Sequence, residues 1–224
     1  MRYKVKTAPT QYPATLADVK RNLRIDTTDT DTDRDQLLND LISDATAASQ
    51  NATGRQYCRA TYTLYLDAYP VSNEIAITMG PVAAINSVKY LKQGETVLTT
   101  VDPSKYQLDN VELTARLRFL ESFSVDADKM NVIEIEVVNG WDNVADDSAT
   151  TASPTTTSDG TTTAAPTTTE APSIGTIPVD LKQAVILRAC EGYLNPDNDD
   201  QHQGSSLKLR SAELKERNYK VPRY

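Results

Sequence analysis

The chain has 224 residues, of which 39% are hydrophobic and 24% charged, and its net charge at pH 7 is −8. This length allows one domain with extensions or two small domains. The negative balance argues against a general nucleic-acid binder, because neutralising phosphates requires clustered Lys and Arg. Two cysteines, Cys58 and Cys190, are too few for a disulfide scaffold, so we expect reduced, partly buried thiols.

Neither the start of the chain nor its longest apolar runs indicate a membrane or a secretory route. The first 13 residues are polar and lack the apolar core of a signal peptide. No run reaches the roughly 18–20 apolar residues that a membrane span needs. We therefore expect a protein that is made and folded in a cytoplasm and has no membrane partner.

The charge is unevenly distributed along the chain. Residues 207–224 hold six basic and two acidic residues and so carry +4, which leaves −12 for the other 206 residues. An acidic body with a basic end predicts that this end docks on an acidic surface, such as that of a neighbouring copy. The candidate docking residues are Lys208, Arg210, Lys215, Arg217, Lys220 and Arg223.

Two helices are predicted near the start of the chain. Residues 15–26 have helical spacing of apolar side chains, and Thr15 with Asp18 forms a capping-box pattern at their start. An Asp/Thr-rich spacer, which favours turns and caps, leads to a second predicted helix over residues 35–53. Gly54 follows that helix, as is typical of a left-handed helix end.

The period of apolar side chains then changes to two, which predicts strands. Gln93-Gly94 indicates a hairpin, and residues 102–105 indicate a turn with Pro at its second position. Glu134 and Glu136 alternate with apolar residues, which predicts one wet face for the last strand. The expected strands cover residues 61–66, 74–79, 82–91, 97–101, 113–120 and 132–138.

Residues 149–172 divide into four hexads that are rich in Thr, Ala and Pro. They contain no large apolar side chain and cannot bury a core of their own. Two interpretations remain open: a flexible insertion, or an extended segment lying on a neighbouring subunit. The second makes the first Thr of three hexads candidates for contacts between subunits, namely Thr155, Thr161 and Thr167.

A third main helix is predicted from Ile177-Pro178 to Leu194, and it is apolar on most sides, as expected of a helix in the middle of a core. Residues 207–217 predict a short basic helix, followed by an extended tail over residues 218–224. The predicted fold is α+β: three main helices, a β-rich middle, a long inserted loop and a C-terminal tail helix. We expect residues 1–206 to form one domain, interrupted by the insertion at 142–176, with residues 207–224 as a docking tail.

No pattern in the sequence indicates a catalytic site or a cofactor. Asp29, Asp31, Asp33 and Asp40 fit four positions of a calcium loop, but Arg34 stands where that loop needs Gly. A second acidic loop, residues 195–200, and the single histidine, His202, lack the spacing of a metal site or a catalytic triad. A metal-dependent enzyme remains a minor alternative, and it predicts that carboxylates converge in one cleft.

Six short segments occur in an order that resembles the head–tail connector, or adaptor, proteins of long-tailed bacteriophages. "DPSKYQLD" is similar to a DPSDY-x-V-D segment of that family, and "VVNGW" stands where the family has a Y-x-x-G-(Y/W) strand end. The 142–176 insertion departs from the short loop that is usual there. The other segments are the "LRID" end of the first helix, "TGRQ", "GPV" with "INSVKY", and "IPVDLKQAV".

The resemblance implies a homo-oligomeric ring in the virion neck, usually of twelve copies, made in the host cytoplasm. Such a ring joins the portal protein to a downstream tail or stopper protein and extends the DNA channel for packaging retention and ejection. Double-stranded DNA would pass without sequence-specific binding, since like charge avoids sticking. The C-terminal segments of the family insert into the portal, which implies portal docking for residues 207–224. The alternative is a secreted or surface-displayed binding module with a Thr-rich stalk and an aromatic-lined pocket.

Overall fold

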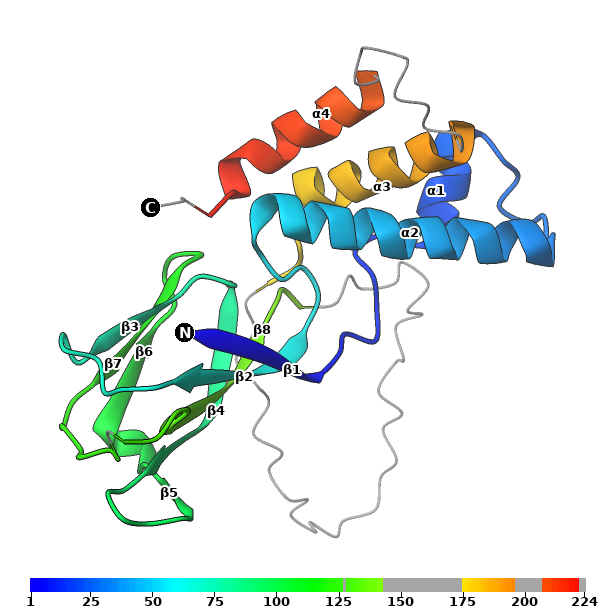
Figure 1. The fold of residues 1–224 in the computed structure, drawn as a ribbon. Coiled ribbons are helices and arrows are strands. Elements are labelled where there is room, and N and C mark those ends of the chain that lie inside the picture. Colours follow the sequence, from blue (N-terminus) through cyan, green and yellow to red (C-terminus); the bar gives the residue numbers. More distant parts are fainter. Residues whose placement is uncertain (127, 143–174, 196–206, 222–224) are drawn as a thin grey trace, which may run out of the picture.

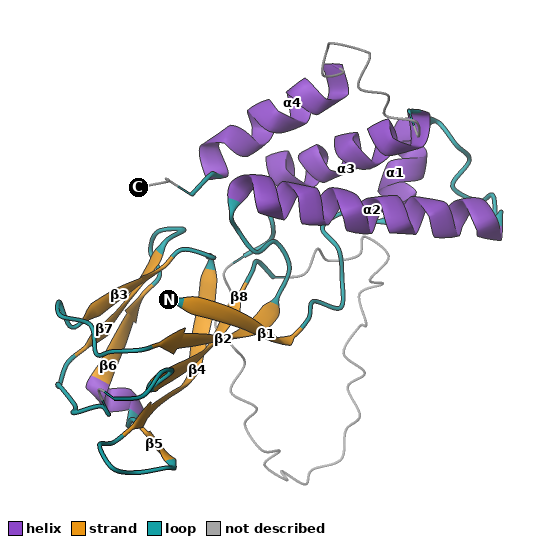
Figure 2. Ribbon diagram, in the orientation of Figure 1, coloured by secondary structure: helices purple, strands orange, loops and turns teal. Residues whose placement is uncertain are grey.

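The computed structural model describes residues 1–126, 128–142, 175–195 and 207–221. Helices gather at one end of the molecule and strands at the other, as Figure 2 shows. The predicted α+β class is therefore confirmed. The candidate contact residues Thr155, Thr161 and Thr167, and most of the acidic loop after Asn195, lie outside the described residues.

Helix α1 (Leu16–Leu23) begins with the predicted capping box. The Asp18 amide donates to Thr15 Oγ1 at 3.2 Å, and the Thr15 amide donates to Asp18 Oδ2 at 3.1 Å. The helix ends earlier than predicted because Arg24 adopts a left-handed conformation with φ 59°. Its amide then closes the last turn on the Arg21 carbonyl oxygen at 3.2 Å.

Helix α2 (Thr32–Thr53) starts three residues before its predicted start. Asp31 caps it by accepting a hydrogen bond from the Arg34 amide at 3.2 Å, so the acidic spacer supplies the cap itself. The helix ends at Gly54, whose φ of 70° is the left-handed conformation that the sequence predicted.

Helix α3 (Val179–Leu194) lies between α2 and α4 (Leu207–Glu216) in Figure 1. It buries apolar side chains toward its neighbours, which explains why its sequence is apolar on most sides. The expected cluster of three helices is confirmed, and α4 adds a fourth. Its core includes Val19, Leu38, Ile42, Leu181, Val185 and Ala189.

The strands form two antiparallel sheets. The larger sheet has the order β1-β2-β8-β4-β5 and the smaller one β3-β7-β6. The strands of the larger sheet are β1 (Arg2–Thr7), β2 (Ala60–Leu66), β8 (Ile133–Asn139), β4 (Val82–Leu91) and β5 (Leu98–Thr100). Those of the smaller sheet are β3 (Glu74–Ile77), β7 (Ala115–Phe119) and β6 (Tyr106–Asp109).

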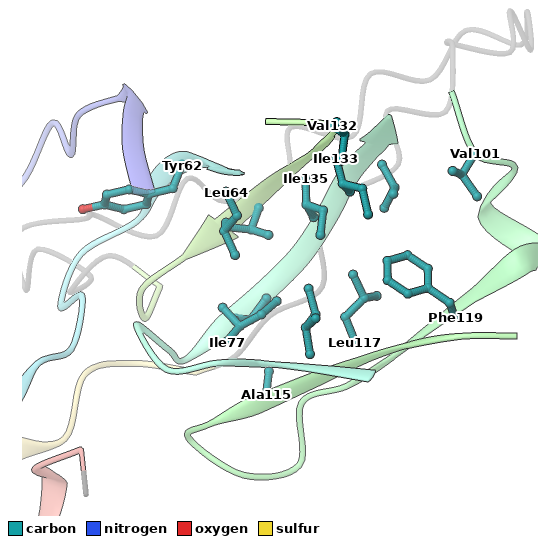
Figure 3. Packing of buried hydrophobic residues seen from close by; sticks show 14 of the residues in the cluster. Tyr62, Leu64, Ile77, Val101, Ala115, Leu117, Phe119, Val132, Ile133 and Ile135 are labelled. Carbon is teal, nitrogen blue, oxygen red and sulfur yellow. The ribbon is translucent and has the colours of Figure 1, made fainter. Parts of the chain in front are cut away.

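The two sheets pack face to face around a second apolar core (Figure 3). Ile77, Leu117 and Phe119 of the smaller sheet point toward side chains of the larger one, which include Leu64 and Ile135. All five side chains are at most 2% exposed. This β-sandwich therefore buries a core separate from that of the helices.

Two strands, β1 and β6, were not predicted. Three of the six residues of β1 are Lys or Arg and most of its side chains are exposed, so the strand lacks an apolar run that would reveal it. Strand β6 follows the 3-10 helix η1 (Pro103–Lys105) and has only four residues. By contrast, the hairpin at Gln93-Gly94 and the wet face with Glu134 and Glu136 are confirmed, because β4 pairs with β5 and both Glu side chains are partly exposed.

Gly140 marks the passage from the sandwich to the helices. Its φ is 103°, and a Cβ there would lie 2.3 Å from the Cys58 carbonyl oxygen, so no other residue fits without moving backbone. The next residue, Trp141, packs edge-on against Tyr57 with ring centroids 6.1 Å apart. Both aromatic side chains belong to the helical core, which joins the end of β8 to the helices.

Candidate docking surface

The C-terminal segment is held against the helices by its inner side. Glu216 at the end of α4 is fully buried and accepts two hydrogen bonds from Arg188 of α3. Arg188 Nε lies 3.0 Å from Glu216 Oε1, and Arg188 Nη2 lies 2.8 Å from Oε2. The hydrogen bonds from Arg188 to Glu216 raise the pKa of Arg188, so its guanidinium stays charged. The fork geometry fixes one orientation of α4 on α3.

The chain after α4 folds back onto the body, so the predicted extended tail is wrong for residues 218 and 219. The 3-10 helix η2 (Arg217–Tyr219) places the Tyr219 carbonyl oxygen 2.7 Å from Arg55 Nε. Two residues later, the Val221 amide donates to the Thr53 carbonyl oxygen at 2.9 Å. The extended-tail prediction failed because Arg55, 164 residues away in sequence, supplies the donor that holds the turn.

Arg55 Nη1 also donates a hydrogen bond to the Leu113 carbonyl oxygen at 2.8 Å. Arg55 therefore joins the C-terminal segment to the sandwich. Burial lowers the pKa of its guanidinium. Because Arg has so high an intrinsic pKa, the group remains charged there, and backbone carbonyls solvate it. This contact gives a structural reason for Arg55 in the "TGRQ" segment.

Exposed side chains form a stripe along the outer side of α4 and the segment that follows it, which we call the basic stripe: Arg210 and Leu214 of α4, Arg217 of η2, and Lys220. Leu214 is a large apolar side chain within this stripe and is 66% exposed. A shallow hollow of about 550 Å³ lies along the stripe, and its lining includes Glu213 as well.

The other predicted docking residues are placed differently. Lys215 lies on the side of α4 toward α3, and its Nζ is 3.3 Å from Asp180 Oδ1. Lys208 lies within α4, and Arg223 lies outside the described residues. Within the described part of the chain, the basic stripe makes no ion pair. Arg210, Arg217 and Lys220 are therefore the predicted residues that the structure leaves open to a partner.

A second exposed surface, on α2, carries acidic side chains that form no ion pair among the described residues. This surface was not predicted from the sequence. Asp33, Asp40 and Asp44 are all exposed and, like the basic stripe, have no ion pair among the described residues. Ala47 and Asn51 continue the same helix face, which lies opposite the buried Leu38 and Ile42. We call these five exposed residues the acidic stripe.

The four Asp side chains that fit the calcium-loop pattern do not converge on one site. Asp29 Oδ2 lies 2.6 Å from Arg34 Nη2, which also keeps the pKa of Asp29 below its usual value. Asp31 is used as the cap of α2, and Asp40 lies on the exposed helix face. In the part of the chain that the structure describes, no group of three or more metal-ligating side chains converges.

The outer face of the larger sheet carries charged side chains of both signs, and these largely neutralise one another. Lys6 Nζ lies 2.5 Å from Glu136 Oε2, and Asn86 donates to the other carboxylate oxygen at 3.1 Å. The hydrogen bond from Lys6 is the main reason why the pKa of Glu136 lies below its usual value. A hollow of about 280 Å³ on this face is lined by charges of both signs.

The binding-module alternative predicts an aromatic-lined pocket. A hollow of about 250 Å³ has Tyr90 and Phe123 in its lining, beside Lys105 and Glu121. The two rings pack on each other with centroids 4.4 Å apart and also pack against the sandwich core. The faces of both rings are therefore used for packing within the protein.

Both cysteines are buried, more so than the sequence suggested. Burial raises the pKa of the Cys58 thiol to about 11, which keeps it protonated and unreactive at neutral pH. Over the described ranges, the structure contains no helix with the length and hydropathy of a membrane span.

Comparison with known proteins identifies a family that part of this chain resembles. Residues 13–98 match the family described as "Phage gp6-like head-tail connector protein". The predicted resemblance to head–tail connectors is confirmed. The matched segment runs from the residues just before α1 through α2 to the start of β5. A search of curated proteins found no match.

Solved structures share the fold of this chain over its whole length. "Neck of empty GTA particle computed with C6 symmetry" aligns with a TM-score of 0.70 and 18% identity, covering 100% of this chain and 97% of the other. "Virion of native gene transfer agent (GTA) particle" gives 0.69 and 19% over the same shares. "Neck of native GTA particle computed with C12 symmetry" gives 0.59 and 17%, again over 100% and 97%. At these identities the likeness shows a shared fold.

Proposed function

We propose that this chain is a structural subunit of the neck of a tailed, phage-like particle. The observation that carries the proposal is an agreement between two independent comparisons. A connector family matches residues 13–98, and the fold of the whole chain matches proteins from the neck of gene transfer agent particles. The geometry is consistent with such a role, because the exposed features described above are docking stripes and mixed-charge faces.

In this proposal, copies of the chain form a ring between the portal protein and a downstream tail or stopper protein. A twelve-fold ring is the number that the resemblance implies, and one matched neck was computed with C12 symmetry. The ring would extend the channel through which double-stranded DNA passes. A net charge of −8 favours passage without adhesion.

The basic stripe is proposed as a docking surface for an acidic neighbour in the particle, and the portal is the partner that the resemblance implies. Arg210, Arg217 and Lys220 would make these contacts, because they are exposed and unpaired within the described residues. Substituting all three with Glu should weaken binding to purified portal, while unchanged binding would exclude the stripe as the portal contact. The expected role of Thr155, Thr161 and Thr167 in contacts between subunits stays a prediction.

The neck assignment is tested by removing the chain from particle-producing cells and examining the particles by electron microscopy. We expect heads without attached tails, and restoration of tailed particles when the full chain is supplied again. Normally tailed, infectious or DNA-delivering particles in its absence would contradict the proposal. Imaging restored particles at neck resolution would then count the copies in the ring.

A further inference from the structure

The acidic stripe of α2 and the basic stripe of α4 are complementary in charge, and each lacks an ionic partner within the described chain. The acidic stripe lies on the side of α2 that is opposite to its buried side. The basic stripe likewise lies opposite to the buried side of α4. Since α3 lies between these two helices (Figure 1), the stripes face away from each other. One chain cannot bring its own two stripes together, whereas two copies can.

The acidic stripe has an unfavourable feature that a partner would relieve. Asp40 and Asp44 are one helical turn apart on an exposed face, and like charges at this spacing destabilise a helix by about 0.2–0.5 kcal/mol. Among the residues that the structure describes, the side chain that bonds one of them is a neutral donor: Gln36 Nε2 lies 3.0 Å from Asp40 Oδ1. Cations brought by another molecule would turn this repulsion into attraction.

The spacing along the two helices also matches. Arg210 and Arg217 are seven residues apart, which is about 10 Å along a helix, and Asp33 and Asp40 have the same separation. Leu214 lies between the two arginines and is the exposed apolar side chain of its stripe.

We propose that the basic stripe of one copy docks on the acidic stripe of the next. The inference rests on the proposed ring, and it names the two faces that join neighbours. Each copy would use a different face toward each neighbour, which is a head-to-tail contact, and such contacts form a closed ring when their rotation closes. A portal surface as the sole target of the basic stripe is the competing outcome.

The test is association of the full chain, measured by sedimentation equilibrium at low and high salt. Wild-type protein should self-associate more strongly at low salt, because screening weakens exposed charge pairs. The pair Asp40→Lys with Asp44→Lys should weaken association at least about tenfold, and so should the pair Arg210→Glu with Arg217→Glu. A chain carrying all four reversals should regain association, since the two faces are complementary again.

Mixing the two defective variants provides a sharper measurement. Each variant carries two stripes of one sign and should stay dissociated alone, whereas the mixture should regain association with the two variants alternating, since every contact between unlike variants joins opposite charges. Reversals of exposed charges away from the stripes, Lys4→Glu and Asp128→Lys, are the matched controls and should associate like wild type. Thermal unfolding of every variant should show that α2 and α4 remain folded.

Three results would overturn the inference: wild type that stays monomeric at low salt, variants that associate normally, or a four-fold reversal that does not recover. The same variants supplied to particles lacking the chain separate this failure from that of the proposed function. Neck rings built from stripe variants as well as from wild type would exclude this contact and retain the neck role. Tailed particles that form without any copy would instead exclude the neck role.

Discussion

In the β-sandwich most ion pairs lie at the surface, whereas in the helical cluster several ion pairs lie between the helices. Arg2–Asp67 on the sandwich leaves both side chains 55% exposed. In the cluster, Lys20 is only 3% exposed where it joins α1 to Asp35 of α2. Lys182 of α3 likewise holds Asp18 of α1 at 2.9 Å, and Arg188 holds Glu216.

The difference follows from how much apolar surface each element offers. Helix α1 has 8 residues and α4 has 10, and each buries few apolar side chains. Directional charge pairs therefore set how these short helices sit on α2 and α3. In the sandwich, buried and exposed side chains alternate along the strands, and a continuous apolar core holds the two sheets together.

The largest expected effect comes from breaking the buried pair at α4. Arg188→Ala leaves the Glu216 carboxylate buried without a cation and should cost about 3–5 kcal/mol of unfolding free energy in urea titration. Hydrogen exchange should rise first over α4, since the pair holds that helix. The double variant Arg188→Met with Glu216→Leu should recover most of the loss, and a cost below 1 kcal/mol for Arg188→Ala would contradict a structural role for the pair.

Truncation in the sandwich should be nearly as costly but different in kind. Ile135 is fully buried, and Ile135→Ala should cost about 3 kcal/mol, because it removes apolar contacts and leaves a cavity. The loss should be the same at low and high salt, and hydrogen exchange at α4 should change little. If the stability loss of Ile135→Ala depended strongly on salt, the two regions would not be held by different forces.

The cap of α1 should show an intermediate effect with a defined pH dependence. Burial raises the pKa of Asp18, but hydrogen bonds from Lys182 and Thr15 outweigh burial and keep it below the usual 3.8. A carboxyl with a depressed folded pKa contributes stability above its unfolded pKa and loses it as pH falls further. Asp18→Asn should therefore cost about 1 kcal/mol at pH 7, and its deficit should shrink below pH 3.8 in thermal unfolding. A deficit that does not change with pH would contradict this assignment.

The smallest effect is expected for an exposed pair on the sheet. Lys6→Ala removes the cation beside Glu136 and should cost less than about 1 kcal/mol, because exposed ion pairs contribute little. It should also raise the pKa of Glu136 toward its ordinary value, which carboxylate NMR titration can follow. A loss comparable to that of Arg188→Ala would remove the distinction between the regions.

Local patterns in the sequence were sufficient for the helices and for most strands. The Thr15–Asp18 capping box and Gly54 mark helix ends through contacts within a few residues, so their signals are visible without the fold. Strand β1 escaped prediction because its identity depends on pairing with β2, nearly 60 residues away. The docking role of the basic residues stays a prediction: the structure shows that one of them, Lys215, is paired within the chain, and the acidic stripe was not predicted. Its Asp residues look like any solvated helix face until the partners of neighbouring charges are known.

By itself, the sequence determined the α+β composition, the helix caps, the apolar α3 and the connector resemblance, because these depend on periodicity and short segments. Only the tertiary structure decided which charges are neutralised within the chain and which remain open. Glu216 and Lys215 are neighbours in α4, yet both are paired inward, while Leu214 and Arg217 point outward. The reason is geometric: a helix turns its residues by 100° each, and only the position of α3 settles which side is buried.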